Sequence, residues 1–109
     1  MPRYAFQLHI RAGREEEYDR IHKAVWPELL QELSDFGVTN YSIFRRGQQL
    51  FLYLHAPDWD ELMKNMANSQ LNLRWQKMMD PIFEPMSGLE PGEPFAMMKE
   101  VFYMPGKND

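Results

Sequence analysis

The stretch YDRIHKAVWPELLQEL, residues 18–33, predicts a helix with one apolar face and is the best starting point for the fold. Its large apolar residues recur with a period close to 3.6, as they do on a helix packed against a core: Ile21, Val25, Leu29, Leu33 and Phe36. Tyr18 and His22 stand one turn apart and therefore share a face of this helix. Pro27 cannot donate a hydrogen bond to the Lys23 carbonyl, which predicts a kink just after His22.

A strand is predicted before this helix, over residues 4–10. Large apolar residues alternate there with smaller or polar ones, and this period of two is typical of a strand with one buried face. Gly13 ends the strand. The three glutamates at 15–17 then fall in the first turn of the helix, where the helix dipole favours negative charge. They have a structural explanation that requires no metal.

Two more strands are predicted after Gly37, over residues 39–44 and 50–56, joined by a turn at residues 46–48. In the first of these, Thr39, Tyr41 and Ile43 form the row that we assign to the helix-covered face. Arg45 and Arg46 are interpreted as solvated charges beside the turn.

The second half of the chain predicts two short helices, a loop and a last strand. Asp58 and Glu61 resemble a capping box that opens a helix reaching about Ala67, and Ser69 is a candidate cap for a second helix. Residues 84–94 are dense in proline, glycine and glutamate and predict an exposed loop. Residues 96–104 form the last apolar segment and are expected to be a strand.

This order of elements matches the split βαβ, or ferredoxin-like, arrangement, an α+β fold with a four-stranded antiparallel sheet. Helices on one face of such a sheet leave the other face uncovered. The uncovered face would present Gln7, His9, Asn40, Ser42 and Phe44. Because it is too aromatic for plain solvent surface, we expect a homodimer that packs two sheets together as a dimeric α+β barrel.

Size and composition narrow the class of protein. The chain has 109 residues, no cysteine and a formal net charge of −4. These values predict one domain over residues 1–109 and a reducing compartment, which we take to be the cytoplasm. The scattered basic residues argue against nucleic-acid binding, and no segment approaches the roughly 18 apolar residues needed to span a membrane.

The motifs of most familiar catalytic sites do not occur in the sequence. It contains no glycine-rich phosphate loop, no HExxH, no paired cysteines and no G-x-S-x-G. His9, His22 and His55 fall on separate elements without the spacing of metal ligands, so we expect neither a metal nor a cofactor.

A pocket between the helices and the sheet is the remaining candidate site. Tyr18 and His22 from the first helix, Tyr41 from the second strand and Trp75 from the last helix could all project into it. Taken singly, His22 also fits an ordinary core or surface histidine, and Tyr41 and Trp75 fit ordinary core residues. Taken together, they combine one proton-transfer group, two phenols and an indole, a set that suits a small polar ligand.

Four stretches of the chain resemble the L-rhamnose mutarotase family: EEYDRIHKAVWPEL, NYSIF, LRWQKMMD and KEVFYMP. The similarity runs from about Arg3 to Pro105. Members of this family are small dimeric ferredoxin-like proteins that interconvert the α and β anomers of a pyranose sugar. The resemblance implies an isomerase in which His22 is the proton donor, while Tyr18, Tyr41 and Trp75 contact the substrate.

One position departs from the family pattern. The family has a second tryptophan directly after the first, whereas this chain has Gln76, which we expect to contact the substrate. An apolar wall suits the methyl group of a 6-deoxy sugar, and an amide suits hydroxyl groups. The sugar is therefore expected to be L-rhamnose or a related aldose, with the choice left open.

The expected reaction needs only proton transfers and a bond rotation. The anomeric hydroxyl loses a proton, the ring oxygen gains one, and the ring closes again on the other face. A positioned acid or base accelerates such proton transfers roughly 10²–10⁴-fold, and imidazole works well near neutral pH. We expect His22 to protonate the ring oxygen, with a tyrosine or a bound water assisting at the anomeric hydroxyl.

Three other functions fit the same sequence: a sugar-binding sensor that does not convert its ligand, a dimeric ferredoxin-like oxygenase that takes a haem or an aromatic substrate, and a purely structural dimer.

Overall fold

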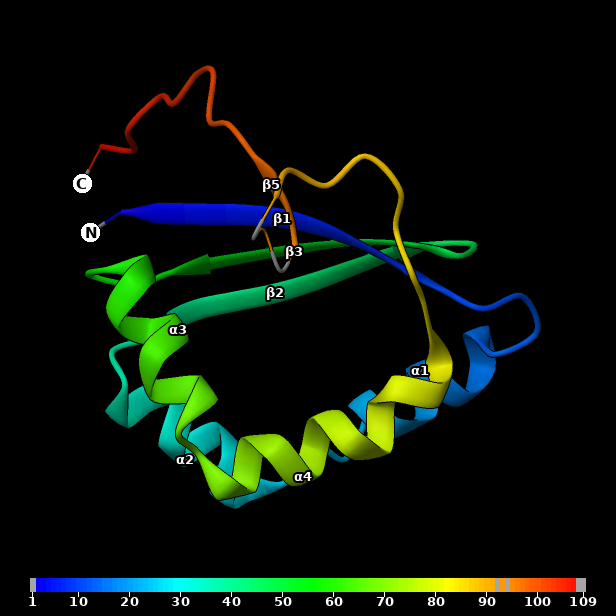
Figure 1. Ribbon diagram of the computed structural model, residues 1–109. Helices are drawn as coiled ribbons and strands as arrows, with labels where there is room; N and C mark the ends of the chain where they lie inside the picture. Colours follow the sequence, from blue (N-terminus) through cyan, green and yellow to red (C-terminus); the bar gives the residue numbers. More distant parts are fainter. Residues whose placement is uncertain (1, 92, 94, 108–109) are drawn as a thin grey trace.

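The computed structural model describes residues 2–91, 93 and 95–107 and shows one antiparallel sheet with helices on a single side (Figure 1). Its elements are β1 (Arg3–Ile10), α1 (Glu15–His22), α2 (Pro27–Asp35), β2 (Thr39–Arg46), β3 (Gln49–His55), α3 (Trp59–Ala67), α4 (Gln70–Met79), the 3₁₀ turn η1 (Asp80–Ile82), β4 (Phe83–Glu84) and β5 (Ala96–Met98). The C-terminal tail leaves from the side of the sheet opposite the helices. This arrangement confirms the predicted α+β class.

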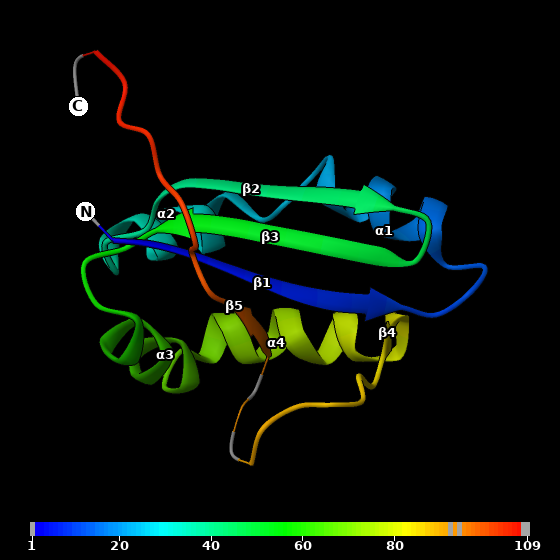
Figure 2. The ribbon, with the colours of Figure 1, turned by 90° about the horizontal axis from the view of Figure 1, so that it is seen from above.

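The strands lie side by side in the order β2-β3-β1-β4, and β5 also pairs with β1 (Figure 2). β4 pairs with His9 and Ile10, whereas β5 pairs with residues 5–7 of the same strand. Two short pieces therefore share the place of the predicted fourth strand.

The prediction that the last strand runs to Met104 is wrong, because β5 ends at Met98. Met98 pairs with Ala5, so the antiparallel ladder would reach the first residue of β1, Arg3, at Glu100. Beyond Glu100, β1 offers no further residue to pair with. Arg3 holds the tail instead, through two hydrogen bonds to the Glu100 carboxylate at 2.9 and 2.8 Å.

The prediction of one kinked helix from residue 18 to residue 33 is also wrong, since the helix breaks completely. α1 ends at His22, and α2 begins at Pro27, the position in a helix where a missing N–H costs nothing. Trp26, directly before the proline, is extended, as a residue in that position usually is. The two helices can therefore form two separate walls around the space below the sheet.

A register shift in β2 overturns the placement of Thr39. Ile43 pairs with the buried Leu52 and so faces the helices, as does Tyr41 two residues earlier. Between Thr39 and Ser42 the register shifts, with Asn40 at a φ of 51°, and Thr39 pairs with His55. Thr39 consequently joins the row on the helix-free face, while the predicted orientation of Tyr41 and Ile43 is confirmed.

Both predicted helix caps are present. The Asp58 side chain accepts a hydrogen bond from the Glu61 N–H at 3.1 Å, and the Ser69 hydroxyl accepts one from the Asn72 N–H at 2.9 Å. The caps fix where α3 and α4 begin.

The core lies between the helices and the inner face of the sheet. Its buried residues come from nearly every element: Phe6, Ile10, Tyr18, Leu29, Val38, Leu50, Leu52, Leu54, Ala56, Leu62, Trp75, Met79 and Ile82. No helix among the described residues has the length and apolar character needed to cross a bilayer. The expectations of a single domain and of a cytoplasmic location stay predictions.

Gly37 turns the chain from α2 into β2. Its φ of +94° and the hydrogen bonds from Val38 N–H to the Leu33 carbonyl and from Gly37 N–H to the Ser34 carbonyl, both 3.0 Å, form a Schellman motif. A Cβ atom at this position would lie 3.0 Å from the Cδ of Pro57. Both the conformation and the space therefore require glycine here.

We expect Gly37→Ala to lower the free energy of unfolding by about 1–3 kcal/mol, since it adds a close contact to the cost of a left-handed backbone. Gly47→Ala is the matched control. Gly47 also has a positive φ, of +59°, but a Cβ atom added there would meet no described residue within 4 Å other than its neighbours in the chain. Urea unfolding followed by circular dichroism would measure both. If both variants lost the same free energy of unfolding, the close contact with Pro57 would not be the cause of the larger effect expected at Gly37.

Candidate active site

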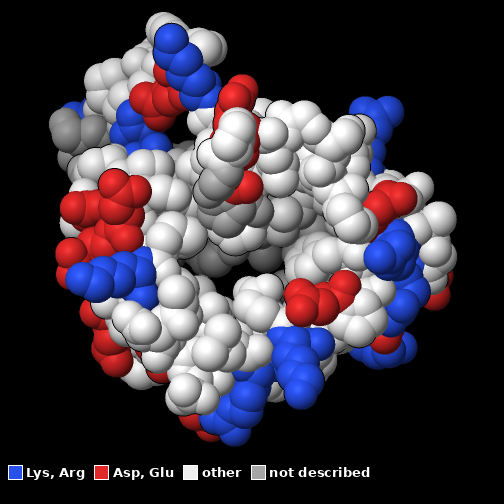
Figure 3. Space-filling view, in the orientation of Figure 1, with Lys and Arg blue, Asp and Glu red and all other residues white. Residues whose placement is uncertain are grey.

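A hollow opens between the sheet and the helices and is visible at the centre of the surface in Figure 3. It consists of two adjoining cavities of about 360 and 280 Å³, close to the size typical of small-molecule sites. Seven residues line both cavities: His22, Leu33, Tyr41, Ile43, Met66, Trp75 and Gln76. Most of the wall is apolar, and the polar groups gather where the two cavities meet.

The structure places all five predicted site residues around this hollow. His22, Tyr41, Trp75 and Gln76 line both cavities, and Tyr18 lines the second. They come from α1, β2 and α4, so only the folded chain brings them together. Their chemical roles stay predictions.

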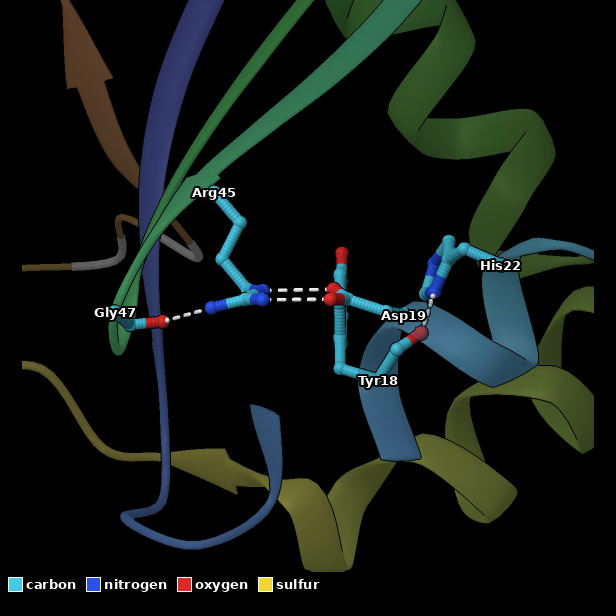
Figure 4. Close-up of polar contacts among 5 residues, drawn as sticks. All are labelled: Tyr18, Asp19, His22, Arg45 and Gly47. Atoms are coloured by element: carbon cyan, nitrogen blue, oxygen red, sulfur yellow. Dashed lines mark hydrogen bonds and ion pairs between the residues drawn. The ribbon is translucent and has the colours of Figure 1, made fainter. Parts of the chain in front are cut away.

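His22 has one ring nitrogen committed to the protein. Its Nδ1 lies 2.9 Å from the backbone carbonyl oxygen of Tyr18 (Figure 4). Because a carbonyl can only accept, Nδ1 carries the hydrogen, and in the neutral ring Nε2 holds the free lone pair. The ring also stacks on Tyr18, with centroids 4.0 Å apart, and meets the Trp75 ring edge-on at 5.8 Å. These contacts fix the orientation of the imidazole and leave Nε2 for proton transfer.

The two phenols are hydrogen-bonding groups rather than bases. Tyr18 is only 3% exposed, and burial raises the pKa of its hydroxyl well above the ordinary value. Tyr41 keeps 39% of its surface accessible as it lines the cavities, yet loss of solvent around its hydroxyl raises its pKa to about 12. Both phenols are therefore neutral at pH 7.

A chain of hydrogen bonds joins α2 to α4 and ends at the hollow. The Ser69 hydroxyl donates to the Glu32 carboxylate and accepts from the Asn72 backbone. The Asn72 side chain donates to the Met66 carbonyl at 3.1 Å and accepts from the Gln76 amide at 3.5 Å. This chain holds the Gln76 amide in the wall of both cavities.

Asn72, which lines the first cavity, was not predicted as a site residue. Asn72 comes three residues after the Ser69 cap and four before Gln76, and the spacing of four places the two amides on one face of α4. That spacing was the signal available in the sequence.

An ion pair between α1 and the β2–β3 hairpin was also not predicted. Arg45 Nε and Nη2 lie 2.7 and 2.6 Å from the two carboxylate oxygens of Asp19, and Nη1 donates to the Gly47 carbonyl at 3.0 Å. These bonds hold the pKa of Asp19 below its usual value. Arg45 is an exposed residue beside the turn, as the sequence predicts, and it also pairs with Asp19, which the sequence does not predict.

The site offers the chemistry of proton transfer on a hydroxylated ligand. It combines one imidazole with a free Nε2, two neutral phenols, two amides and the indole of Trp75, whose ring also meets that of Trp26 at 5.0 Å. Within the part of the chain that the structure describes, no three histidine or acidic residues lie close enough together to hold a metal ion.

Comparison with known proteins identifies a family of matching sequences. The model of the L-rhamnose mutarotase family matches residues 3–104. A protein of Opitutus terrae described as L-rhamnose mutarotase is 38% identical over 112 residues, and one of Bacillus subtilis with the same description is 34% identical over 106. Each alignment covers 95% of this chain and 99% of the relative.

Two solved structures share the fold. The crystal structure of an L-rhamnose mutarotase from Formosa agariphila has a TM-score of 0.78 and 29% identity, covering 96% of this chain and all of the other. A type-II polyketide cyclase, tetracenomycin F2 cyclase from Streptomyces glaucescens, has a TM-score of 0.60 over the same share of the chain. At 16% identity, this second likeness shows the fold alone.

Proposed function

The chain belongs to the L-rhamnose mutarotase family, and from this premise we propose that it interconverts the α and β pyranose anomers of L-rhamnose or a related aldose, with His22 as the proton-transfer residue. The observation that carries the proposal is the fixed imidazole of His22, which lines a hollow of sugar-binding size and has Nδ1 bonded to the Tyr18 carbonyl. Such an enzyme is an isomerase.

In the proposed reaction, Nε2 of protonated His22 donates its hydrogen to the ring oxygen as the bond from the ring oxygen to the anomeric carbon breaks. The anomeric hydroxyl loses its proton and becomes a carbonyl. Rotation about the bond between the first two carbons presents the other face of this carbonyl, and ring closure reverses the proton transfers. The raised pKa values of Tyr18 and Tyr41 favour a water molecule as the acceptor of the anomeric proton, since a neutral phenol is a poor base.

The other site residues are proposed to hold the sugar. Tyr18 and Tyr41 present phenols that can hydrogen-bond to its hydroxyl groups, and Trp75 supplies a flat apolar wall. The Gln76 side chain donates one N–H to Asn72, which leaves its amide oxygen and its second N–H for the sugar. An amide at this position suits a sugar hydroxyl better than a methyl group.

We also propose a homodimer formed through the helix-free face of the sheet. Phe44 on that face is 65% exposed, and in the tail Val101, Phe102 and Met104 are 87%, 79% and 74% exposed. Large apolar side chains as exposed as these are available for contact with a partner. A second copy would cover it without blocking the hollow, which lies on the helix side of the sheet.

We expect native protein to accelerate anomer exchange of L-rhamnose, measured by NMR exchange between the anomeric proton signals, and His22→Ala to lose roughly 10²–10⁴-fold of this acceleration. His9→Ala is the matched control, because His9 lies on β1 away from the hollow. A saturable sugar signal without faster exchange would indicate a passive sensor instead. Full activity in His22→Ala would remove the role assigned to His22.

Gln76→Trp should shift preference toward L-rhamnose relative to L-mannose, which differs from it only by a hydroxyl at the sixth carbon. A tryptophan gives an apolar wall to the methyl group that L-rhamnose carries at this carbon. We expect the ratio of the kcat/KM values for the two sugars to change about tenfold. Gln70→Trp, at an exposed position of the same helix, is the control. An unchanged ratio in Gln76→Trp would show that this residue does not select the sugar.

Light scattering after size exclusion should give twice the chain mass of 13.1 kDa. Phe44→Glu should yield monomers, because it places a charge within the proposed interface. Leu73→Glu, a similar change at a residue that is 48% exposed on α4, should remain dimeric. A native chain that elutes as a monomer would exclude the proposed assembly.

A further inference from the structure

We propose that the Asp19–Arg45 ion pair is a positioning clamp that holds α1, and with it His22, at the correct distance from β2. This inference rests on the proposed function, since it assigns the clamp to proton transfer by His22. Figure 4 shows Arg45 reaching from the end of β2 to Asp19 on α1, beside Tyr18 and His22.

The helix that carries His22 needs such support. α1 has only eight residues, and its N-cap residue, Arg14, makes no side-chain capping hydrogen bond. The break before Pro27 separates it from α2, so the longer helix cannot hold it in line. Burial of Tyr18 anchors one side of α1 in the core, but one buried ring does not by itself fix how the helix is rotated.

The clamp joins the two elements whose relative position matters for the site. Arg45 lies four residues after Tyr41 on β2, and alternation along the strand places both side chains on the helix-facing side. Asp19 directly follows Tyr18 and lies three residues, nearly one turn, before His22. The distance between these two elements therefore sets the distance between His22 and Tyr41 across the hollow.

The geometry of the pair suits positioning. Two nearly parallel hydrogen bonds, of 2.7 and 2.6 Å, link the guanidinium to both carboxylate oxygens, and a paired contact of this kind resists rotation better than a single bond. The third guanidinium nitrogen is held by the Gly47 carbonyl at 3.0 Å. The arginine is thus fixed to the hairpin turn before it reaches the helix.

Energetics distinguish positioning from simple stabilisation. The two side chains are 27% and 44% exposed, and ion pairs with that much solvent contact add little to global stability. A displacement of about 1 Å at a reacting group, in contrast, can lower a rate by about 10²-fold. A clamp should therefore affect kcat far more than it affects unfolding.

The test compares native protein with Asp19→Asn and Arg45→Gln in the anomer-exchange assay, with thermal unfolding measured in parallel. We expect each substitution to lower kcat about tenfold or more, with KM changed less than twofold and the melting temperature nearly unchanged. The exchanged pair Asp19→Arg with Arg45→Asp should recover part of the loss. In NMR spectra, the ring-proton shifts of His22 should move in the single variants, because its stacking on Tyr18 changes.

Glu17→Gln is the matched control, since Glu17 pairs with Arg14 at the start of α1 and this ion pair does not reach β2. It should leave kcat and the His22 signals at their native values. Native kcat in Asp19→Asn, or a loss of rate that only follows a loss of folded protein, would overturn the clamp while leaving the proposed function intact. A native chain that accelerates the exchange of neither L-rhamnose nor L-mannose would instead overturn the proposed function.

Discussion

The missing N–H of Pro27 is the constraint on which the site depends. Because Pro27 can begin a helix but not continue one, the chain forms two short helices in place of one long helix, and their axes need not align. α1 brings Tyr18 and His22 to the hollow, while α2 supplies the apolar side chains of Leu29 and Leu33. A continuous helix would have imposed one direction on both walls.

The break also explains why side-chain bonds matter so much in this fold. α1 is joined to the sheet by Arg45 and Asp19, and α2 is joined to α4 by Glu32 and Ser69. Each of these contacts links residues at least 26 positions apart in the sequence. The walls of the hollow are thus held by bonds between elements, where the backbone itself provides no continuity.

Local patterns predicted most of the elements, because caps, turns and alternation depend on residues close in sequence. Asp58 and Ser69 cap their helices as expected, and Tyr41 faces the helices as its row predicted. The errors have non-local causes. Thr39 lies on the other face because of a register shift that only pairing with β3 reveals. The last strand ends at Met98, opposite Ala5, and could in any case pair no further than Glu100, opposite the first residue of β1. Arg45 lies beside a turn in the sequence, and no pattern near it identifies Asp19 as its partner.

The same reasoning explains why the candidate site could be predicted while its polar support could not. A histidine and a tyrosine four residues apart on one helix must lie close together, so their stacking follows from the sequence. The free Nε2 of His22 follows only from the observed bond to the Tyr18 carbonyl, and the neutrality of both phenols follows from their surroundings. Among the seven residues that line both cavities, the His22 imidazole is the group suited to proton transfer near neutral pH, and ring opening of a sugar needs little more than one such well-placed group. Selectivity must then come from the walls, where Asn72 holds the Gln76 amide at the junction of the two cavities.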